Sequence, residues 1–197
     1  MNEPDTKQRI LDAAVEMMLE QSFHSVGLNQ ILSSVKVPKG SFYHYFPSKE
    51  QFGVELLRHY ADTSNDYRRK MLLNNEVEEN PVQRLLTFFT SAVGRFQESG
   101  GKCPCLLQKL ATEVANFSDS MREELATAFA DAIIIFRQTL DEAVTKEFLP
   151  QGFDTASEAE FIMDHWAGAQ QRALISRDAK PLRDTVEMFR ERLLALS

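Results

Sequence analysis

The stretch VPKGSFYHYFPSKE, residues 37–50, decides the fold of this chain. Pro38 lacks a backbone N–H, so it ends the preceding helix and is well suited to open the next one at its first turn. Pro47 stops that next helix after two turns. Ser48, followed three residues later by Gln51, forms the capping pattern that starts another helix. The stretch therefore predicts a two-turn helix over residues 39–46, held between a tight turn and a longer helix.

Two more short helices are expected before this stretch. Apolar residues recur at the i, i+3, i+4 and i+7 spacing over residues 28–35, which predicts one buried helical face. Residues 6–21 carry a similar stripe, with Asp5 or Thr6 as the capping residue. Two short helices around a tight turn, packed on a third, form the helix-turn-helix arrangement, whose second helix enters the major groove of DNA.

The second short helix carries the groups that such a role requires. Phe42 and Phe46 are four residues apart and are expected to face the core. An entirely buried aromatic run is excluded, because consecutive aromatic positions cover the whole circumference of a helix and some must be exposed. Glycine lets a backbone approach a sugar-phosphate closely. The residues expected to contact DNA are Lys39, Gly40, Ser41, Tyr43, His44 and Tyr45.

The net charge of −7 does not exclude DNA, because the local charge of the binding face decides. Residues 26–50 carry Lys36, Lys39 and Lys49 against Glu50 alone, a local charge of +2 that leaves −9 for the rest of the chain. A small cationic end on an acidic chain is typical of a sequence-specific DNA-binding protein.

The rest of the chain indicates an all-α protein of about nine helices. It has 197 residues, 43% of them hydrophobic, and only 8 Gly and 7 Pro, too few for the many turns of an all-β protein. Further helices are expected over residues 49–74, 81–97, 104–115, from 119 onward, 155–177 and 182–196. Asn80 and Ser118 are the expected caps of two of them, and Thr155 with Glu158 forms a second capping box. Two cysteines form no disulfide framework, and no segment resembles a signal peptide or a membrane span, so we expect a cytoplasmic protein.

Residues 37–50, with the segment 10–14 and Phe23, resemble the signature of the tetracycline-repressor (TetR) family of bacterial transcription regulators. The resemblance implies a DNA-binding domain over residues 1–50 and a helical effector-binding and dimerisation domain over residues 51–197, connected by the helix 49–74. It also implies that the recognition-helix residues above contact DNA and that Lys49 binds a phosphate. Gly27-Leu28 departs from the family pattern, in which many members have a phosphate-binding threonine.

Aromatic residues in the second domain are candidates for an effector cavity, because small-molecule sites are largely apolar with a few polar groups. They are Phe88, Phe89, Phe96, Phe129, Phe136 and Trp166, with Gln170, Gln171 and His165 as candidate polar groups. The alternative for each aromatic residue is that it fills a helical core.

The segment Cys103-Pro104-Cys105 precedes the helix expected over residues 104–115. Because proline suits the first helical position, we expect Cys105 in the first turn, where the helix dipole stabilises a thiolate. This region, with residues 167–169 and 175–177, resembles the family branch that represses N-ethylmaleimide reductase, which implies that electrophiles react at Cys105. The alternatives are a buried small hydrophobe or a reactive thiol without a regulatory role.

The last two helices are expected to form a homodimer interface. Residues 167–169, Ala-Gly-Ala, allow another helix to approach closely, and Leu182, Val186, Phe189 and Leu193 form an apolar stripe. The alternative is that both features are buried within one chain. Two-fold symmetry would match a palindromic operator.

The sequence argues against two other classes of protein, an enzyme and a protein-interaction scaffold. The P-loop, G-x-G-x-x-G, H-E-x-x-H and G-x-S-x-G motifs are absent from the sequence, and the four histidines are dispersed, so we expect no enzyme, no cofactor and no metal site. An all-helical protein-interaction scaffold would leave the exposed aromatic residues of the helix 39–46 unexplained. We therefore expect a repressor that binds double-stranded DNA and is released by a small apolar or electrophilic effector.

Overall fold

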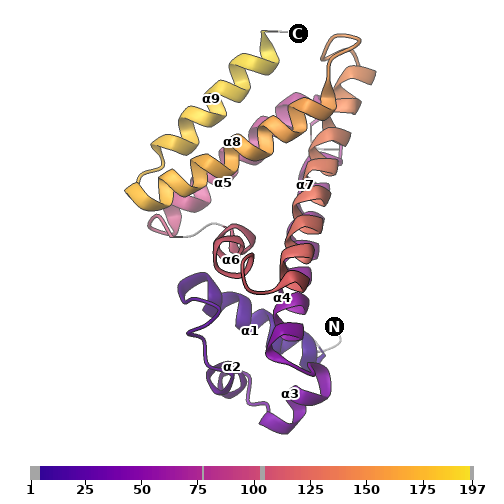
Figure 1. The fold of residues 1–197 in the computed structure, drawn as a ribbon. Helices are drawn as coiled ribbons and strands as arrows, with labels where there is room; N and C mark the ends of the chain where they lie inside the picture. The colour runs from indigo at the N-terminus through magenta and orange to yellow at the C-terminus, as the bar shows by residue number, and fades with distance from the viewer. Residues whose placement is uncertain (1–4, 77, 103–104, 196–197) are drawn as a thin grey trace. The chain divides into compact units, whose positions relative to one another are not determined.

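The computed structural model describes residues 5–76, 78–102 and 105–195, and within these residues the chain forms nine α-helices and no strand (Figure 1). They are α1 (Thr6–Glu20), α2 (Leu28–Ser34), α3 (Lys39–Tyr45), α4 (Lys49–Leu72), α5 (Pro81–Glu98), α6 (Leu106–Val114), α7 (Asp119–Thr145), α8 (Thr155–Ser176) and α9 (Lys180–Leu194). The predicted all-α class is confirmed.

The chain forms two compact units. Residues 1–63 with 105–128 make one, called the head unit below, and residues 64–104 with 129–197 make the other, the body unit. The helices α4 and α7 each begin in the head unit and end in the body unit. The functional domains expected over residues 1–50 and 51–197 differ from these two units, and that division stays a prediction. The units are divided elsewhere because α6 packs on α1 and the start of α7 contacts the start of α4.

Most of the predicted helix starts are capped by the expected side chains. The Gln51 N–H donates to Ser48 Oγ at 3.0 Å, the Val82 N–H donates to Asn80 Oδ1 at 2.9 Å, and the Met121 N–H donates to Ser118 Oγ at 3.2 Å. These bonds satisfy N–H groups that have no partner inside the helix.

Two predicted caps are wrong. Asp5 precedes α1 without a side-chain capping bond, and Thr6 is already helical. At α8 the cap is Asp154, whose carboxylate accepts from the N–H and the hydroxyl of Ser157, whereas Thr155 is the first helical residue. The hydrogen bonds from Ser157 hold the pKa of Asp154 below its ordinary value. A carboxylate is the stronger acceptor, so it takes the capping position from the adjacent hydroxyl.

Aromatic side chains fill the core of the body unit. Phe89 is fully buried, and its ring centroid lies 4.7 Å from that of Trp166, 5.2 Å from that of Phe189 and 5.5 Å from that of Phe136. In Figure 1, α8 and α9 run side by side as an antiparallel pair, and α9 also packs on α5. Burial of large aromatic surfaces of this kind dominates the stability of a helical core.

A buried arginine joins three segments of the body unit. The Arg84 guanidinium on α5 donates to the carbonyl oxygens of Leu72 at 2.8 Å and Glu78 at 2.9 Å, and it forms an ion pair with Glu142 on α7. Its side chain is 2% exposed. A buried charge is tolerated only with such partners, because its desolvation is otherwise uncompensated.

The apolar stripe of α9 is not a surface feature. Leu182, Val186, Phe189 and Leu193 are 0–4% exposed in a single chain, so the prediction that they face a partner subunit is wrong. They pack inside the body unit because the i, i+4 spacing places them on the face that contacts α5 and α8. The surface that α8 and α9 leave open is a shallow groove of about 470 Å³, whose lining includes Gly168, His165, Asp184 and Met188.

Candidate nucleic-acid interface

The head unit has an aromatic core that fixes the orientation of α3. The ring centroid of Phe42 lies 5.0 Å from that of Phe46 and 5.3 Å from that of Phe52 on α4. All three side chains are 2% exposed or less, as are Ile10 and Met18 of α1. The predicted burial of Phe42 and Phe46 is confirmed, and their orientation forces the opposite face of α3 toward solvent.

The turn between α2 and α3 is closed by two backbone hydrogen bonds. The Val37 N–H donates to the Leu32 carbonyl at 2.9 Å and the Lys36 N–H to the Ser33 carbonyl at 3.3 Å, the pattern of a Schellman motif. This motif requires a left-handed residue, and Lys36 takes that conformation with φ of 56°. The Arg9 guanidinium donates to the Val35 carbonyl at 2.7 Å and ties the turn to α1.

The outward face of α3 presents most of the residues expected to contact DNA. Lys39, Gly40 and His44 are exposed, Tyr43 is 54% exposed, and Ser41 and Tyr45 are half-buried. A Cβ atom added at Gly40 would meet nothing within 4 Å. The fold therefore does not require glycine at this position. A molecule that approaches the backbone closely, such as DNA, would explain why residue 40 is glycine.

Lys49 lies beside this face, at the start of α4. It is exposed, its ammonium nitrogen is 5.2 Å from the centroid of the Phe23 ring, and it lies 3.5 Å from the carbonyl oxygen of His24. The cation–π contact orients the ammonium group without neutralising it. The structure thus brings Lys49 and the α3 residues together in one unit.

The helix α6 is attached to the end of α1 by a charged side chain. The Lys109 ammonium group donates to the carbonyl oxygens of Met18 at 2.8 Å, Leu19 at 3.0 Å and Gln21 at 2.9 Å. These carbonyls lack partners inside α1, and a cation at a helix C-terminus is favoured by the helix dipole. One turn further along α6, the Glu113 carboxylate accepts from the Phe23 N–H at 2.8 Å.

The start of α7 is attached to α4 in a similar way. The hydroxyl groups of Ser118 and Ser120 donate to the Glu50 carboxylate at 2.6 and 3.2 Å. Arg58 donates two hydrogen bonds to Glu124, and these bonds raise the pKa of the Arg58 guanidinium. The sequence pattern did not indicate these contacts or those of Lys109, Glu113 and Arg9, because each joins residues far apart in the chain and leaves no local spacing to detect.

The residues expected to bind an effector lie mainly in the body unit. Phe88 and Phe89 are buried and in ring contact with each other at 5.1 Å, and Trp166 and Gln170 are 7% and 8% exposed on α8. Phe129 is half-buried near the middle of α7, and Gln171 and His165 are exposed. The structure brings Phe88, Phe89 and Trp166 together around the core described above.

Cys105 is the residue that precedes α6. Its backbone is extended, with φ of −144° and ψ of 115°, and its side chain is half-buried. The prediction of a first-turn position is therefore wrong by one residue, because α6 begins at Leu106 and Cys105 is its N-cap residue. Cys103 and Pro104 lie outside the described residues.

Among the described residues, no group of three or more His, Cys, Asp or Glu side chains is placed to hold a metal ion. No helix there is long and apolar enough to cross a membrane.

An exposed, lysine-flanked helix, anchored by its aromatic face behind a tight turn, defines the head unit as a helix-turn-helix DNA-binding module. Two family models match the chain. Residues 10–56 match the N-terminal model of the bacterial regulatory proteins of the tetR family, and residues 81–189 match the tetracyclin repressor-like C-terminal domain.

The chain is also similar to named repressors over nearly its whole length. It is 33% identical to the HTH-type transcriptional repressor NemR of Escherichia coli over 185 residues, and this alignment covers 93% of this chain and 92% of NemR. It is 27% identical to the repressor DhaR of a Mycobacterium species, over 95% and 92% of the two chains. The crystal structure of reduced E. coli NemR matches with a TM-score of 0.88 over 95% of this chain and 96% of that one, at 29% identity. This protein belongs to the TetR family and is a DNA-binding transcriptional regulator.

Proposed function

We propose that this protein is a cytoplasmic repressor that binds a palindromic operator as a homodimer and is released by a small apolar or electrophilic effector. The observation that carries the DNA-binding part is the outward face of α3, where Lys39, Tyr43 and His44 are exposed on a helix fixed by Phe42 and Phe46. The similarity to NemR and DhaR, both named as transcriptional repressors, supports repression over activation.

The DNA contacts divide into two kinds. Tyr43, His44 and Tyr45 are proposed to meet the major groove, with Lys39 and Ser41 beside them and the backbone at Gly40 close to the sugar-phosphate. Lys49 is proposed to bind a phosphate. Phosphate contacts set affinity and its salt dependence, whereas base contacts set specificity.

DNA binding is tested with the promoter fragment upstream of the protein's own coding region. Replacing Lys49 by Ala should weaken binding to all sequences and reduce the slope of log affinity against log salt by about one. Replacing Tyr43 by Ala should weaken the specific complex while helix content and dimerisation stay unchanged. A protein-interaction scaffold, the alternative function, would show no salt-dependent binding to this fragment, and unchanged affinity in both variants would overturn the assigned face.

The dimer is proposed to form through α8 and α9, with the groove beside Gly168 as its centre. A Cβ atom at Gly168 would meet nothing within 4 Å, so this position is open in the single chain. Small residues let two helices approach closely, and a two-fold axis here would give a pair of recognition helices for two half-sites.

The release step is proposed to act through α6. Modification of Cys105, or an apolar effector contacting Phe88, Phe89, Phe129, Trp166 or Gln170, would favour a different position of the helices around it. Because Lys109 and Glu113 bind α1 and Phe23, a displaced α6 would pull on the segment that supports α2 and α3. An effector shifts the population of such states only by binding one of them better. No substrate turnover or cofactor is part of this proposal.

A further inference from the structure

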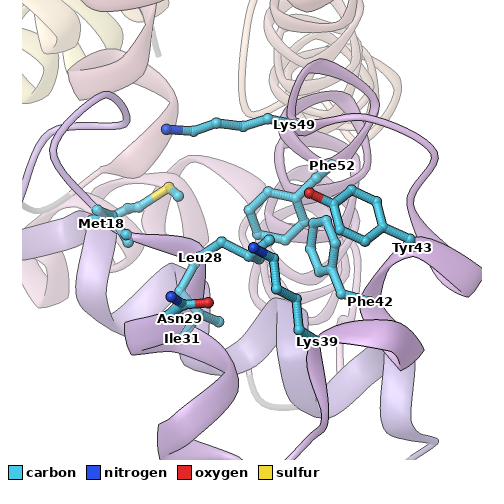
Figure 2. A pocket seen from close by; sticks show the side chains of 11 residues that line it. Met18, Leu28, Asn29, Ile31, Lys39, Phe42, Tyr43, Lys49 and Phe52 are labelled. Atoms are coloured by element: carbon cyan, nitrogen blue, oxygen red, sulfur yellow. The ribbon is translucent and has the colours of Figure 1, made fainter.

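The head unit contains a cavity of about 310 Å³ that the proposed DNA contacts do not explain. It lies between α2, α3 and the start of α4 (Figure 2). Its apolar lining comes from Met18, Val26, Leu28, Ile31, Phe42 and Phe52. This volume is at the lower end of the roughly 300–1,000 Å³ typical of small-molecule pockets.

The remaining lining is cationic and polar. Lys39, Tyr43 and Lys49 contribute to it, and none of the eleven lining residues is acidic. In Figure 2 the ammonium group of Lys39 and the hydroxyl group of Tyr43 point toward the space between them. The Lys49 side chain also lines this space, and its ammonium nitrogen lies 3.5 Å from the carbonyl oxygen of His24. The cavity therefore combines an apolar interior with an excess of positive charge.

This combination selects one class of ligand. A free phosphate would pair with the lysines and leave the apolar lining in contact with water. A neutral hydrocarbon would cover the apolar lining but give the Lys39 ammonium group no acceptor, and the Lys49 ammonium group would keep only the carbonyl oxygen of His24 at 3.5 Å. A carboxylate on a small apolar or aromatic group meets both requirements, because charge-assisted hydrogen bonds form at one end and apolar area is buried at the other.

We propose that this cavity binds small amphipathic carboxylates and that such a ligand competes directly with DNA. The competition rests on the proposed function, since Lys39, Tyr43 and Lys49 would serve both partners. Binding of the carboxylate does not rest on it. This route of release would need no chemistry at Cys105 and no movement of α6, so the protein would have two independent inputs.

The test uses the full-length protein with methionine methyl groups labelled for NMR and 3-phenylpropionate as the probe. Met18 lines the cavity, and Met188 lines the groove in the body unit and serves as an internal reference. We expect a saturable shift of the Met18 methyl signal alone. Binding should be weakened about threefold to tenfold in Lys39→Gln and in Lys49→Gln, because each removes one charged hydrogen-bond donor.

Two controls separate the outcomes. The variant Lys36→Gln removes an exposed lysine outside the cavity and should bind the probe normally. The alcohol 3-phenylpropanol has the same body without the charge and should bind more weakly. No shift at Met18, or equal shifts with the alcohol and in Lys49→Gln, would overturn the proposal. Loss of operator binding by the unliganded protein would instead overturn the proposed function, while the Met18 signal would still report on the cavity.

Discussion

The ammonium nitrogen of Lys109 lies 2.9 Å from the carbonyl oxygen of Gln21, the residue that ends α1. Two other carbonyl oxygens of the same helix end share this donor. The first residues after α1 lead directly into the helix-turn-helix. Lys109 therefore connects the position of α6 to the position of the DNA-binding helices, and Glu113 makes a second connection through Phe23.

Replacing Lys109 by Met should remove this connection while keeping the apolar part of the side chain. We expect the head unit to lose about 2 kcal/mol of stability, the usual contribution of hydrogen bonds to a charged group. Urea unfolding followed by circular dichroism measures this. The control Lys180→Met removes an exposed ion pair with Asp184 and should change stability by less than about 1 kcal/mol. Equal effects of the two variants would show that Lys109 does not support α1.

Replacing Gly40 by Ala should separate folding from DNA binding. No atom lies within 4 Å of the added Cβ, and alanine favours a helix over glycine by about 0.5–1 kcal/mol, so stability should rise or stay unchanged. Operator affinity should fall about tenfold if the backbone at Gly40 approaches the DNA closely, which corresponds to about 1.4 kcal/mol. Fluorescence anisotropy with labelled operator measures the affinity.

The matched control is Gly94→Ala. Gly94 lies within α5 of the body unit, and a Cβ atom there would likewise meet nothing within 4 Å. This variant should gain similar stability and bind the operator as the parent protein does. Full operator affinity in Gly40→Ala would remove the argument for a close backbone contact.

Replacing Cys105 by Ser should abolish release from DNA by an electrophile such as a quinone. The reactive form of cysteine is the thiolate, and a serine hydroxyl at the same position does not react under these conditions. The measurement is operator occupancy before and after treatment, with Cys103→Ser as the control that retains release. Normal release in the Cys105 variant would contradict the sensing proposal.

Replacing Gly168 by Trp should convert the dimer to monomer. The large side chain would fill the groove between α8 and α9, where the partner helix is proposed to lie. Size-exclusion chromatography with light scattering gives the mass. The control Lys70→Trp places the same side chain on an exposed face of α4. A dimeric Gly168 variant would place the interface elsewhere.

Replacing Arg84 by Met should destabilise the body unit by about 3 kcal/mol, the typical result of removing one partner of a buried ion pair. The change removes the donor that Arg84 supplies to the Glu142 carboxylate and to three carbonyl groups. Thermal unfolding by calorimetry measures the loss. The variant Lys146→Met removes the half-buried second partner of Glu142, whose side chain is 29% exposed, and should cost less. Similar losses in both variants would mean that Arg84 is not essential to the core.

Local patterns predicted the helices and the inward face of α3 well. Pro38, Pro47 and the Ser48 cap set the ends of the helix 39–45, and all three lie next to it in the sequence. The i, i+4 spacing of Phe42 and Phe46 predicts their burial without any distant residue. The exposed residues of the opposite face follow from the same geometry.

The sequence did not predict which surface each apolar or charged side chain contacts. The apolar stripe that includes Phe189 has the same spacing whether it packs on α5 or on a second subunit, and only the three-dimensional structure shows that it is buried in one chain. Lys109 is about 90 residues from its acceptors in sequence, so no local pattern indicates it. The left-handed Lys36 was also unforeseen, because glycine is the usual residue there.

The brevity of α3 has a thermodynamic consequence. A helix of seven residues with a glycine near its start is barely stable by itself, so α3 depends on the packing of Phe42 and Phe46, and we expect its outer residues to open transiently when no DNA is present. Part of the intrinsic binding energy then goes into ordering this helix on the duplex. Association would accordingly show a more negative heat-capacity change than rigid docking of the same area, and amide protons of α3 would exchange more slowly in the complex.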